Sequence, residues 1–232
     1  MKYGLRLPIA VLVVALAVSL LAAPSLAFSG ELRSDLLPPG IVGTGFWVTT
    51  GPVHLEWSVN PDMGVPGLWN YSYRLTVPDG DISHFILECS NDLRVEEIVG
   101  LSGTFTDIEI NDFSAAGPGG SNPNIPGPIH GIKFDMVDTT TGIFSFKTFR
   151  EPVWGDFYAK NGTAHNDPDV FNTAWNAGFL DPDPTDPPSD GSINFHVLVP
   201  DTGLPVIPDA STLFLASLGA LPLLAMRRKV LR

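Results

Sequence analysis

Two stretches of this sequence alternate strictly between apolar and polar side chains, VHLEWSVN at 53–60 and WNYSYRLTV at 69–77. Successive side chains of a strand point to opposite faces, so this alternation predicts two strands that each bury one face. Weaker alternation predicts further strands at IKFDM (132–136), FSFKT (144–148) and INFHVLV (193–199). The run ISHFILEC (82–89) is more continuously apolar, which predicts a central strand.

Turn-forming segments that contain Gly and Pro separate these runs, in a chain that has 23 Gly and 22 Pro in all. They are PDG at 78–80, AAGPGGSNPNIPGP at 115–128 and DPDPTDPPSDG at 181–191. No long amphipathic helix is evident between them. We therefore expect an all-β fold, an antiparallel and jelly-roll-like β-sandwich over residues 44–201, with residues 28–43 as an N-terminal linker.

The first 27 residues have the pattern of a secretory signal peptide. Lys2 and Arg6 form a basic start, an apolar stretch follows from roughly residue 9 to 21, and Ser25-Leu26-Ala27 obeys the small-x-small rule. Cleavage is expected between Ala27 and Phe28. The rest of the chain would then work outside the cytoplasm.

The last segment, residues 202–232, has three parts: a short motif at 207–212, an uncharged apolar helix at 210–226 and a basic tail at 227–232. A helix of that length is about 25 Å long, a little short of a hydrocarbon core of about 30 Å. The cluster Arg227-Arg228-Lys229 would hold the terminus on the cytoplasmic side of a membrane. A buried core helix would explain the apolar run but not this cluster.

The tail resembles the PEP-CTERM sorting signal of exported bacterial proteins. That family motif reads Pro-Glu-Pro before a Ser/Thr-containing helix start, and this chain has Pro208, Asp209, Ala210, Ser211 and Thr212, with Ala in place of the second proline. The resemblance implies that an exosortase, a membrane-embedded cysteine transpeptidase, cuts near the motif. A permanent membrane anchor is the alternative.

The middle of the chain is similar to a recurrent domain of PEP-CTERM proteins that carries no known activity. The similar stretches are GDISHFILECS (80–90), NPNIPGPIHGIKFD (122–135), EPVWGDFYAKNG (151–162) and WNAGF (175–179). The resemblance implies a cell-envelope or extracellular-matrix protein associated with exopolysaccharide or biofilm.

Charge and cysteine content narrow the function classes. The formal net charge is −12, and six of the 13 Lys and Arg lie in the two terminal segments, so the domain between them is strongly acidic. Nucleic-acid binding needs a basic face, so no nucleic-acid partner is expected. The single cysteine, Cys89, excludes an internal disulfide and is expected to pack as a small apolar residue.

The segment PVWGDFYAKNG is the densest patch of aromatic and polar residues. A carbohydrate-binding surface could be built from Trp154, Asp156, Tyr158 and Lys160, with aromatic faces that stack on sugar rings. The alternative is a central strand with Trp154 in the core and Gly155 as a bulge, since aromatic residues in strands usually pack.

Four acids lie close together in the loop 181–191, namely Asp181, Asp183, Asp186 and Asp190. Carboxylates suit Ca²⁺, but the spacing does not match the twelve-residue calcium loop, and the intervening prolines stiffen the segment. A solvated acidic turn is the alternative to a calcium site.

The sequence lacks the Gly-x-Ser-x-Gly, His-Glu-x-x-His and phosphate-loop motifs, so no catalytic residue is assigned and a non-enzymatic protein is expected. We predict an exported, exosortase-processed structural or adhesive protein. The alternatives are a carbohydrate-active enzyme that uses two carboxylates and a calcium-dependent carbohydrate-binding module. An enzyme predicts paired carboxyls with a raised pKa in a cleft. A structural protein predicts buried Trp57 and Trp154.

Overall fold

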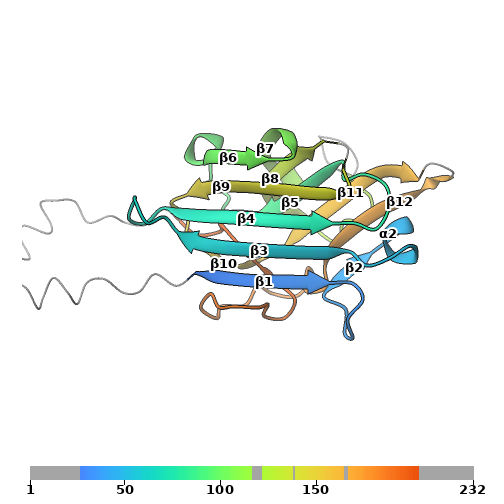
Figure 1. Ribbon diagram of the computed structural model, residues 1–232, viewed down its shortest axis with the longest axis horizontal. Coiled ribbons are helices and arrows are strands. Elements are labelled where there is room, and N and C mark those ends of the chain that lie inside the picture. The colour runs from blue at the N-terminus through green and yellow to red at the C-terminus, as the bar shows by residue number, and fades with distance from the viewer. Residues whose placement is uncertain (1–26, 117–121, 138, 165–166, 204–232) are drawn as a thin grey trace, which may run out of the picture.

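The computed structural model describes residues 27–116, 122–137, 139–164 and 167–203 (Figure 1). The predicted signal peptide before Ala27, the sorting motif at 208–212 and the basic cluster at 227–229 lie outside the described residues. Within the described ranges, no helix is long and apolar enough to cross a membrane.

The described chain is mostly β, and every strand pairing in it is antiparallel, as the alternation predicts. One sheet has five strands in the order β1-β3-β4-β9-β6. Their bounds are Phe28–Arg33 (β1), His54–Pro61 (β3), Trp69–Thr76 (β4), Thr141–Thr148 (β9) and Val99–Gly103 (β6).

A second sheet has six strands in the order β2-β12-β11-β5-β8-β7, and β10 and β13 form a two-stranded sheet. The bounds are Ile41–Gly43 (β2), Asp167–Asn176 (β12), Phe157–Ala164 (β11), His84–Glu88 (β5), Ile129–Met136 (β8), Phe105–Phe113 (β7), Val153–Gly155 (β10) and Val197–Val199 (β13). A short helix α2 (Phe46–Thr49) and the 3-10 helix η1 (Val95–Glu97) complete the described elements.

The five- and six-stranded sheets form two layers that share one core (Figure 1). Aromatic rings from the two layers meet there: the centroids of Phe134 and Phe144 are 4.2 Å apart, and those of Tyr73 and Phe85 are 6.3 Å apart. Trp57 is buried with the alternate residues of β3 and β4, which confirms the predicted inner faces. The hydrophobic effect over this face is the main force that holds the layers together.

Strand β5 lies between β11 and β8, as its apolar run predicts. Phe85 and Leu87 face the shared core, whereas Ile86 faces a second apolar cluster on the other side of the six-stranded sheet. Tyr158 and Phe113 belong to that second cluster. Because both faces of β5 are covered, its residues show no alternation.

Two expectations about strand placement are wrong. Residues 28–43 are not a linker, because β1 pairs with β3 and β2 pairs with β12. The predicted strand at 193–199 is limited to β13, because Asn194 and Phe195 have φ values of 47° and 63°, in the left-handed region that a strand cannot use. A turn therefore precedes β13, and it sets the direction of His196.

Candidate functional site

The site begins where the chain leaves the two-stranded sheet and enters the six-stranded sheet. Asp156 is the residue between β10 and β11. The preceding Gly155 ends β10 rather than forming the expected bulge, and a Cβ atom there would lie 2.7 Å from Oε2 of Glu88. A larger residue at this crossing would displace the Glu88 carboxyl or the Val199 side chain, so glycine lets the Glu88 carboxyl approach the backbone.

Hydrogen bonds hold Asp156 in place on three sides. Its backbone N–H donates to Oε2 of Glu88 at 2.7 Å, and its carbonyl oxygen accepts from the Glu88 N–H at 3.0 Å. Its side-chain Oδ1 accepts from Nδ2 of Asn176 at 2.7 Å. Asn176 is itself buried and accepts from the Phe157 N–H through Oδ1 at 3.0 Å, so its amide orientation is determined.

The His196 ring faces Asp156 from the turn before β13. It is completely buried, and its Nδ1 lies 3.3 Å from the Ile193 carbonyl oxygen. The ring packs against Gly178, where an added Cβ would lie 2.7 Å from the His196 Cε1. Its Nε2 has no hydrogen-bond partner among the described residues.

Asp183 reaches the same place from the Asp/Pro loop. The His196 Nε2 lies 3.5 Å from Oδ1 of Asp183 and 3.6 Å from Oδ1 of Asp156. The three atoms all lie within 4.8 Å of one another. The Asp183 side chain is 43% exposed, so this side of the group opens to solvent.

Crowding of acids in a partly buried place raises their pKa values. Burial, followed by the charges of Asp183 and Asp156, raises the pKa of Glu88 to about 8. Burial also raises the pKa of Asp156 to about 6, against the Asn176 hydrogen bond, which lowers it. The pKa values of Asp183 and Asp201 are raised as well, chiefly by burial. Either a bound proton or a bound metal cation would relieve the repulsion between these carboxylates.

The predicted carbohydrate-binding surface is not formed. Trp154 is 1% exposed and packs in the core, as the alternative interpretation proposed, and Tyr158 is buried on the opposite side of its sheet. The Tyr158 hydroxyl donates to the Pro123 carbonyl oxygen at 2.6 Å. Lys160, on β11, is half-buried and is paired in the sheet with His84 of β5. Of the four residues, only Asp156 belongs to the site.

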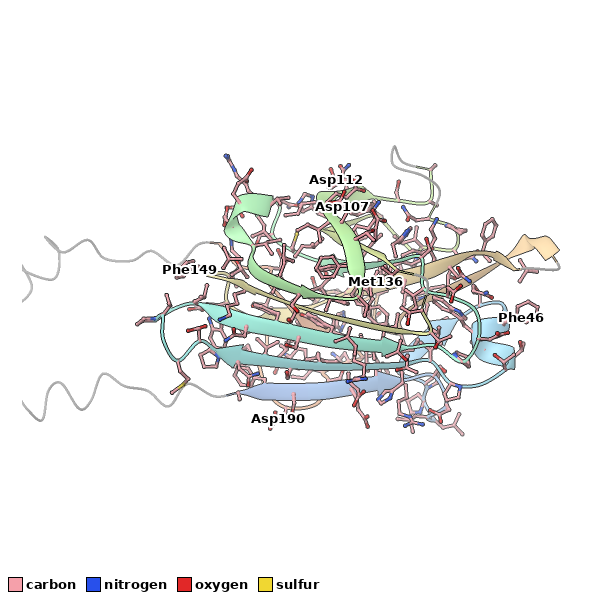
Figure 2. All side chains as sticks on the ribbon, turned by 45° about the horizontal axis from the view of Figure 1, so that its top comes forward. Phe46, Asp107, Asp112, Met136, Phe149 and Asp190 are labelled. Carbon is pink, nitrogen blue, oxygen red and sulfur yellow. The ribbon has the colours of Figure 1, made fainter. Side chains whose placement is uncertain are left out.

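The four acids of the loop 181–191 do not converge either. Asp183 alone joins Asp156 and His196. Asp190 lies along the first strand, where its Oδ1 accepts from the Ser29 N–H at 2.9 Å (Figure 2). Asp181 and Asp186 are exposed. The Asp181 N–H closes a turn with the Gly178 carbonyl oxygen at 2.7 Å, which directs the chain past His196.

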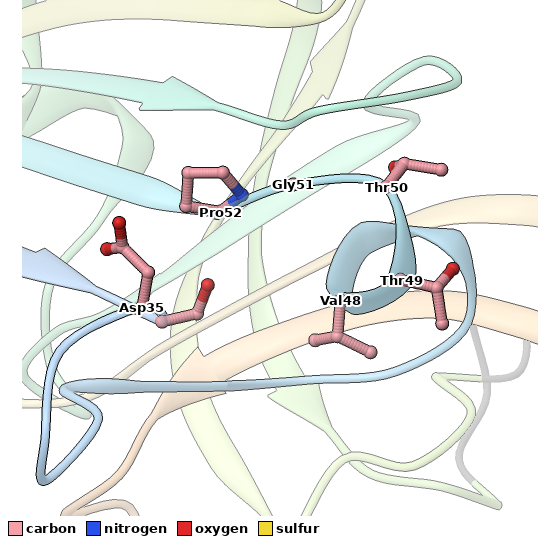
Figure 3. A pocket seen from close by; sticks show the side chains of 7 residues that line it. Asp35, Val48, Thr49, Thr50, Gly51 and Pro52 are labelled. Carbon is pink, nitrogen blue, oxygen red and sulfur yellow. The ribbon is translucent and has the colours of Figure 1, made fainter.

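Two surface pockets lie away from this site. One of about 360 Å³ is lined by the end of α2 and the residues that follow it, together with Ser34 and Asp35 (Figure 3). The Asp35 carboxylate pairs with Arg33 at 2.8 Å, and this hydrogen bond lowers its pKa. A second pocket of about 270 Å³ lies on β3 and β4, over Trp57 and Arg74. Neither holds two neighbouring carboxyls that could act as an acid–base pair.

His196, Glu88 and Asn176 were not singled out from the sequence. His196 was predicted to lie in a regular strand, where alternate polar residues face solvent. Glu88 and Asn176 lie next to apolar runs and carry no spacing signal. No known family model matches the chain, and no curated protein or solved structure is significantly similar to it.

Proposed function

We propose that the chain is an exported protein of a bacterial cell envelope or extracellular matrix, processed by an exosortase, with a structural or adhesive role in association with exopolysaccharide. The observation that supports this proposal best is the position of the two ends of the described domain. Both lie at the same end of the sandwich (Figure 1), and they are next in the sequence to the segments that have the patterns of a signal peptide and a sorting signal.

A chain of contacts links the two ends. Phe28 is paired with Val59, and Val59 is paired with Tyr71 on the next strand. The Tyr71 hydroxyl donates to the Arg150 carbonyl oxygen at 2.8 Å, and the Arg150 Nη1 donates to the Thr202 carbonyl oxygen at 2.9 Å. A domain tethered through either end would thus present its opposite end to the exterior.

The expected signal-peptide cleavage is compatible with this domain. Phe28 is the first residue of β1, and its ring stacks on Trp69 with the centroids 6.3 Å apart. Cleavage after Ala27 would leave the whole strand in the mature protein. Cleavage near Asp209 would likewise leave the contacts of Thr202 intact.

We also infer a jelly-roll-like sandwich. Its support is that the chain changes sheet repeatedly, from β4 to β5, from β5 to β6, from β6 to β7 and from β8 to β9. Such crossings are typical of jelly rolls, in which consecutive strands often belong to opposite sheets.

Intact-mass measurement on the protein recovered from its native host tests the proposal. We expect a chain that starts at Phe28 and ends between Val206 and Asp209, with or without an added glycan. A mass that retains Arg232 would instead indicate a permanent anchor and would contradict exosortase processing.

A further inference from the structure

The buried His196 imidazole faces two carboxylates without a hydrogen bond to either of them. Its Nδ1 faces the Ile193 carbonyl oxygen, which favours a proton on Nδ1 and leaves a lone pair on Nε2. Carboxylate oxygens of Asp183 and Asp156 lie 3.5 and 3.6 Å from this Nε2. These distances are too long for hydrogen bonds, so a neutral ring here would leave three electron-rich atoms facing one another.

The same distances suit a shared metal ion. Bonds of 2.0 to 2.2 Å in a tetrahedral site place neighbouring ligand atoms about 3.4 Å apart. The separations from Nε2 to the two oxygens are close to this value. The oxygens of Asp156 and Asp183 lie within 4.8 Å of each other, and Asp183 is exposed enough to move inward and close the remaining gap.

The surroundings of the ligands match those of metal sites. The metal-binding nitrogen of a histidine is usually oriented by a hydrogen bond from the other ring nitrogen, here to the Ile193 carbonyl oxygen. Asn176 orients the Asp156 carboxylate in the same way. Two of the three ligand side chains are therefore each held by a hydrogen bond, and the three ligand atoms lie within 4.8 Å of one another.

We propose that Asp156, Asp183 and His196 bind a divalent transition metal of the zinc class, with a water molecule in the remaining position. One imidazole and two carboxylates suit such an ion, whereas Ca²⁺ prefers six to eight oxygen ligands. The ion would join three separate segments: the crossing between β10 and β11, the Asp/Pro loop and the turn before β13. This inference does not depend on where the protein is located.

A metal ion at this site would stabilise the folded chain. Cys89 is the only cysteine, so the chain cannot form an internal disulfide to constrain its loops. A metal ion that ties the Asp/Pro loop to the sheets would constrain the unfolded chain in a comparable way. The loop contains four prolines and no regular strand, so few backbone hydrogen bonds hold it otherwise.

Calorimetric titration of the untagged, chelator-treated mature protein with ZnCl₂ tests the proposal. We expect one Zn²⁺ per chain, with an affinity reduced at least about tenfold in Asp183→Asn and unchanged in Asp186→Asn, the matched control in the same loop. His196→Gln, which removes the imidazole ligand, should abolish zinc binding. Because His196 is buried, its variant could fail to fold. The comparison between Asp183→Asn and Asp186→Asn, both at exposed positions, therefore decides the test. Zinc should raise the melting temperature of the wild type and of Asp186→Asn, but not of Asp183→Asn.

Three results would overturn the proposal. They are the absence of stoichiometric zinc binding in the wild type, equal affinity in the two Asp variants, and binding of CaCl₂ in place of ZnCl₂. Equal affinity would place the zinc on surface histidines such as His54, which pairs with Glu31. Absorption of the Co²⁺ complex checks the geometry, since a four-coordinate site absorbs far more strongly in the visible range than a six-coordinate one.

Discussion

The guanidinium of Arg150 donates to a single oxygen of Glu97, with Nε 3.1 Å and Nη2 2.8 Å from Oε2. Its Nη1 also donates to Asp92 Oδ1 at 2.7 Å and to the Thr202 carbonyl oxygen. The Arg150 side chain is 1% exposed, so the charge depends on these partners. This cluster joins β9 to the last described residues of the domain.

Replacing Arg150 by Met should destabilise the protein by about 2 kcal/mol, because the partly buried Glu97 and the Thr202 carbonyl group lose a charged hydrogen-bond donor, whereas Asp92 is 70% exposed and can be solvated by water instead. Arg33→Met is the matched control: its ion pair with Asp35 lies at the surface, where solvent screening leaves it little effect on stability. Urea unfolding measures both. A similar loss in the two variants would show that burial of Arg150 contributes nothing.

Substitution of Trp154 distinguishes a packing role in the core from a role in sugar binding. Trp154→Ala should cost about 3 to 5 kcal/mol, since it leaves a large cavity in the core, and Trp154→Phe should cost less. Phe46→Ala, at an exposed position of helix α2, should cost below about 1 kcal/mol. A Trp154→Ala variant of normal stability that loses binding to polysaccharide would contradict the structural role.

His84 should make stability depend on pH. Burial, together with the charges of Lys160 and Lys133, lowers its pKa to about 3, although the hydrogen bond to Asn122 Oδ1 at 3.0 Å favours the charged ring. Asp135 of β8 is paired with His84 in the sheet. The unfolded chain therefore takes up a proton near pH 6.5 that the folded chain refuses until about pH 3.

Between these values the free energy of unfolding should fall by up to about 1.4 kcal/mol for each pH unit of acidification. Above pH 6.5 the His84 ring is neutral in both the folded and the unfolded chain, so this loss of stability is absent there. Urea titrations at pH 5 and pH 6.5 should show a smaller difference in His84→Gln than in the wild type. His54→Gln controls for the loss of an imidazole, and an equal reduction in both variants would contradict the assignment to His84.

The basic cluster at the C-terminus should decide whether the tail is processed. Replacing Arg227, Arg228 and Lys229 together by Ser removes the charges expected to stop the helix in the membrane, so most of the protein should remain uncleaved. Arg232→Ser leaves the cluster intact and should mature normally. Immunoblots and intact masses from the native host distinguish the forms. Normal maturation of the triple variant would contradict the sorting mechanism.

Local side-chain patterns were sufficient for much of the fold. The inner faces of β3 and β4 follow from alternation at 53–60 and 69–77, because the two-residue period of a strand is set by its own backbone. The central place of β5 follows from its continuous apolar run. Strand β1 was missed because FSGELR is short and polar, and its stability comes from pairing with β3.

The candidate site depended on long-range contacts. Asp156 was selected for aromatic neighbours that prove to be buried, and Asp183 was selected as one of four similar acids. Neither choice could include His196, whose direction is set by the left-handed residues Asn194 and Phe195. The sequence by itself determined a β-rich, acidic domain between two segments with export patterns. Only the tertiary structure brought three distant side chains within 4.8 Å, because strand pairing and sheet crossing, rather than spacing along the chain, set that distance.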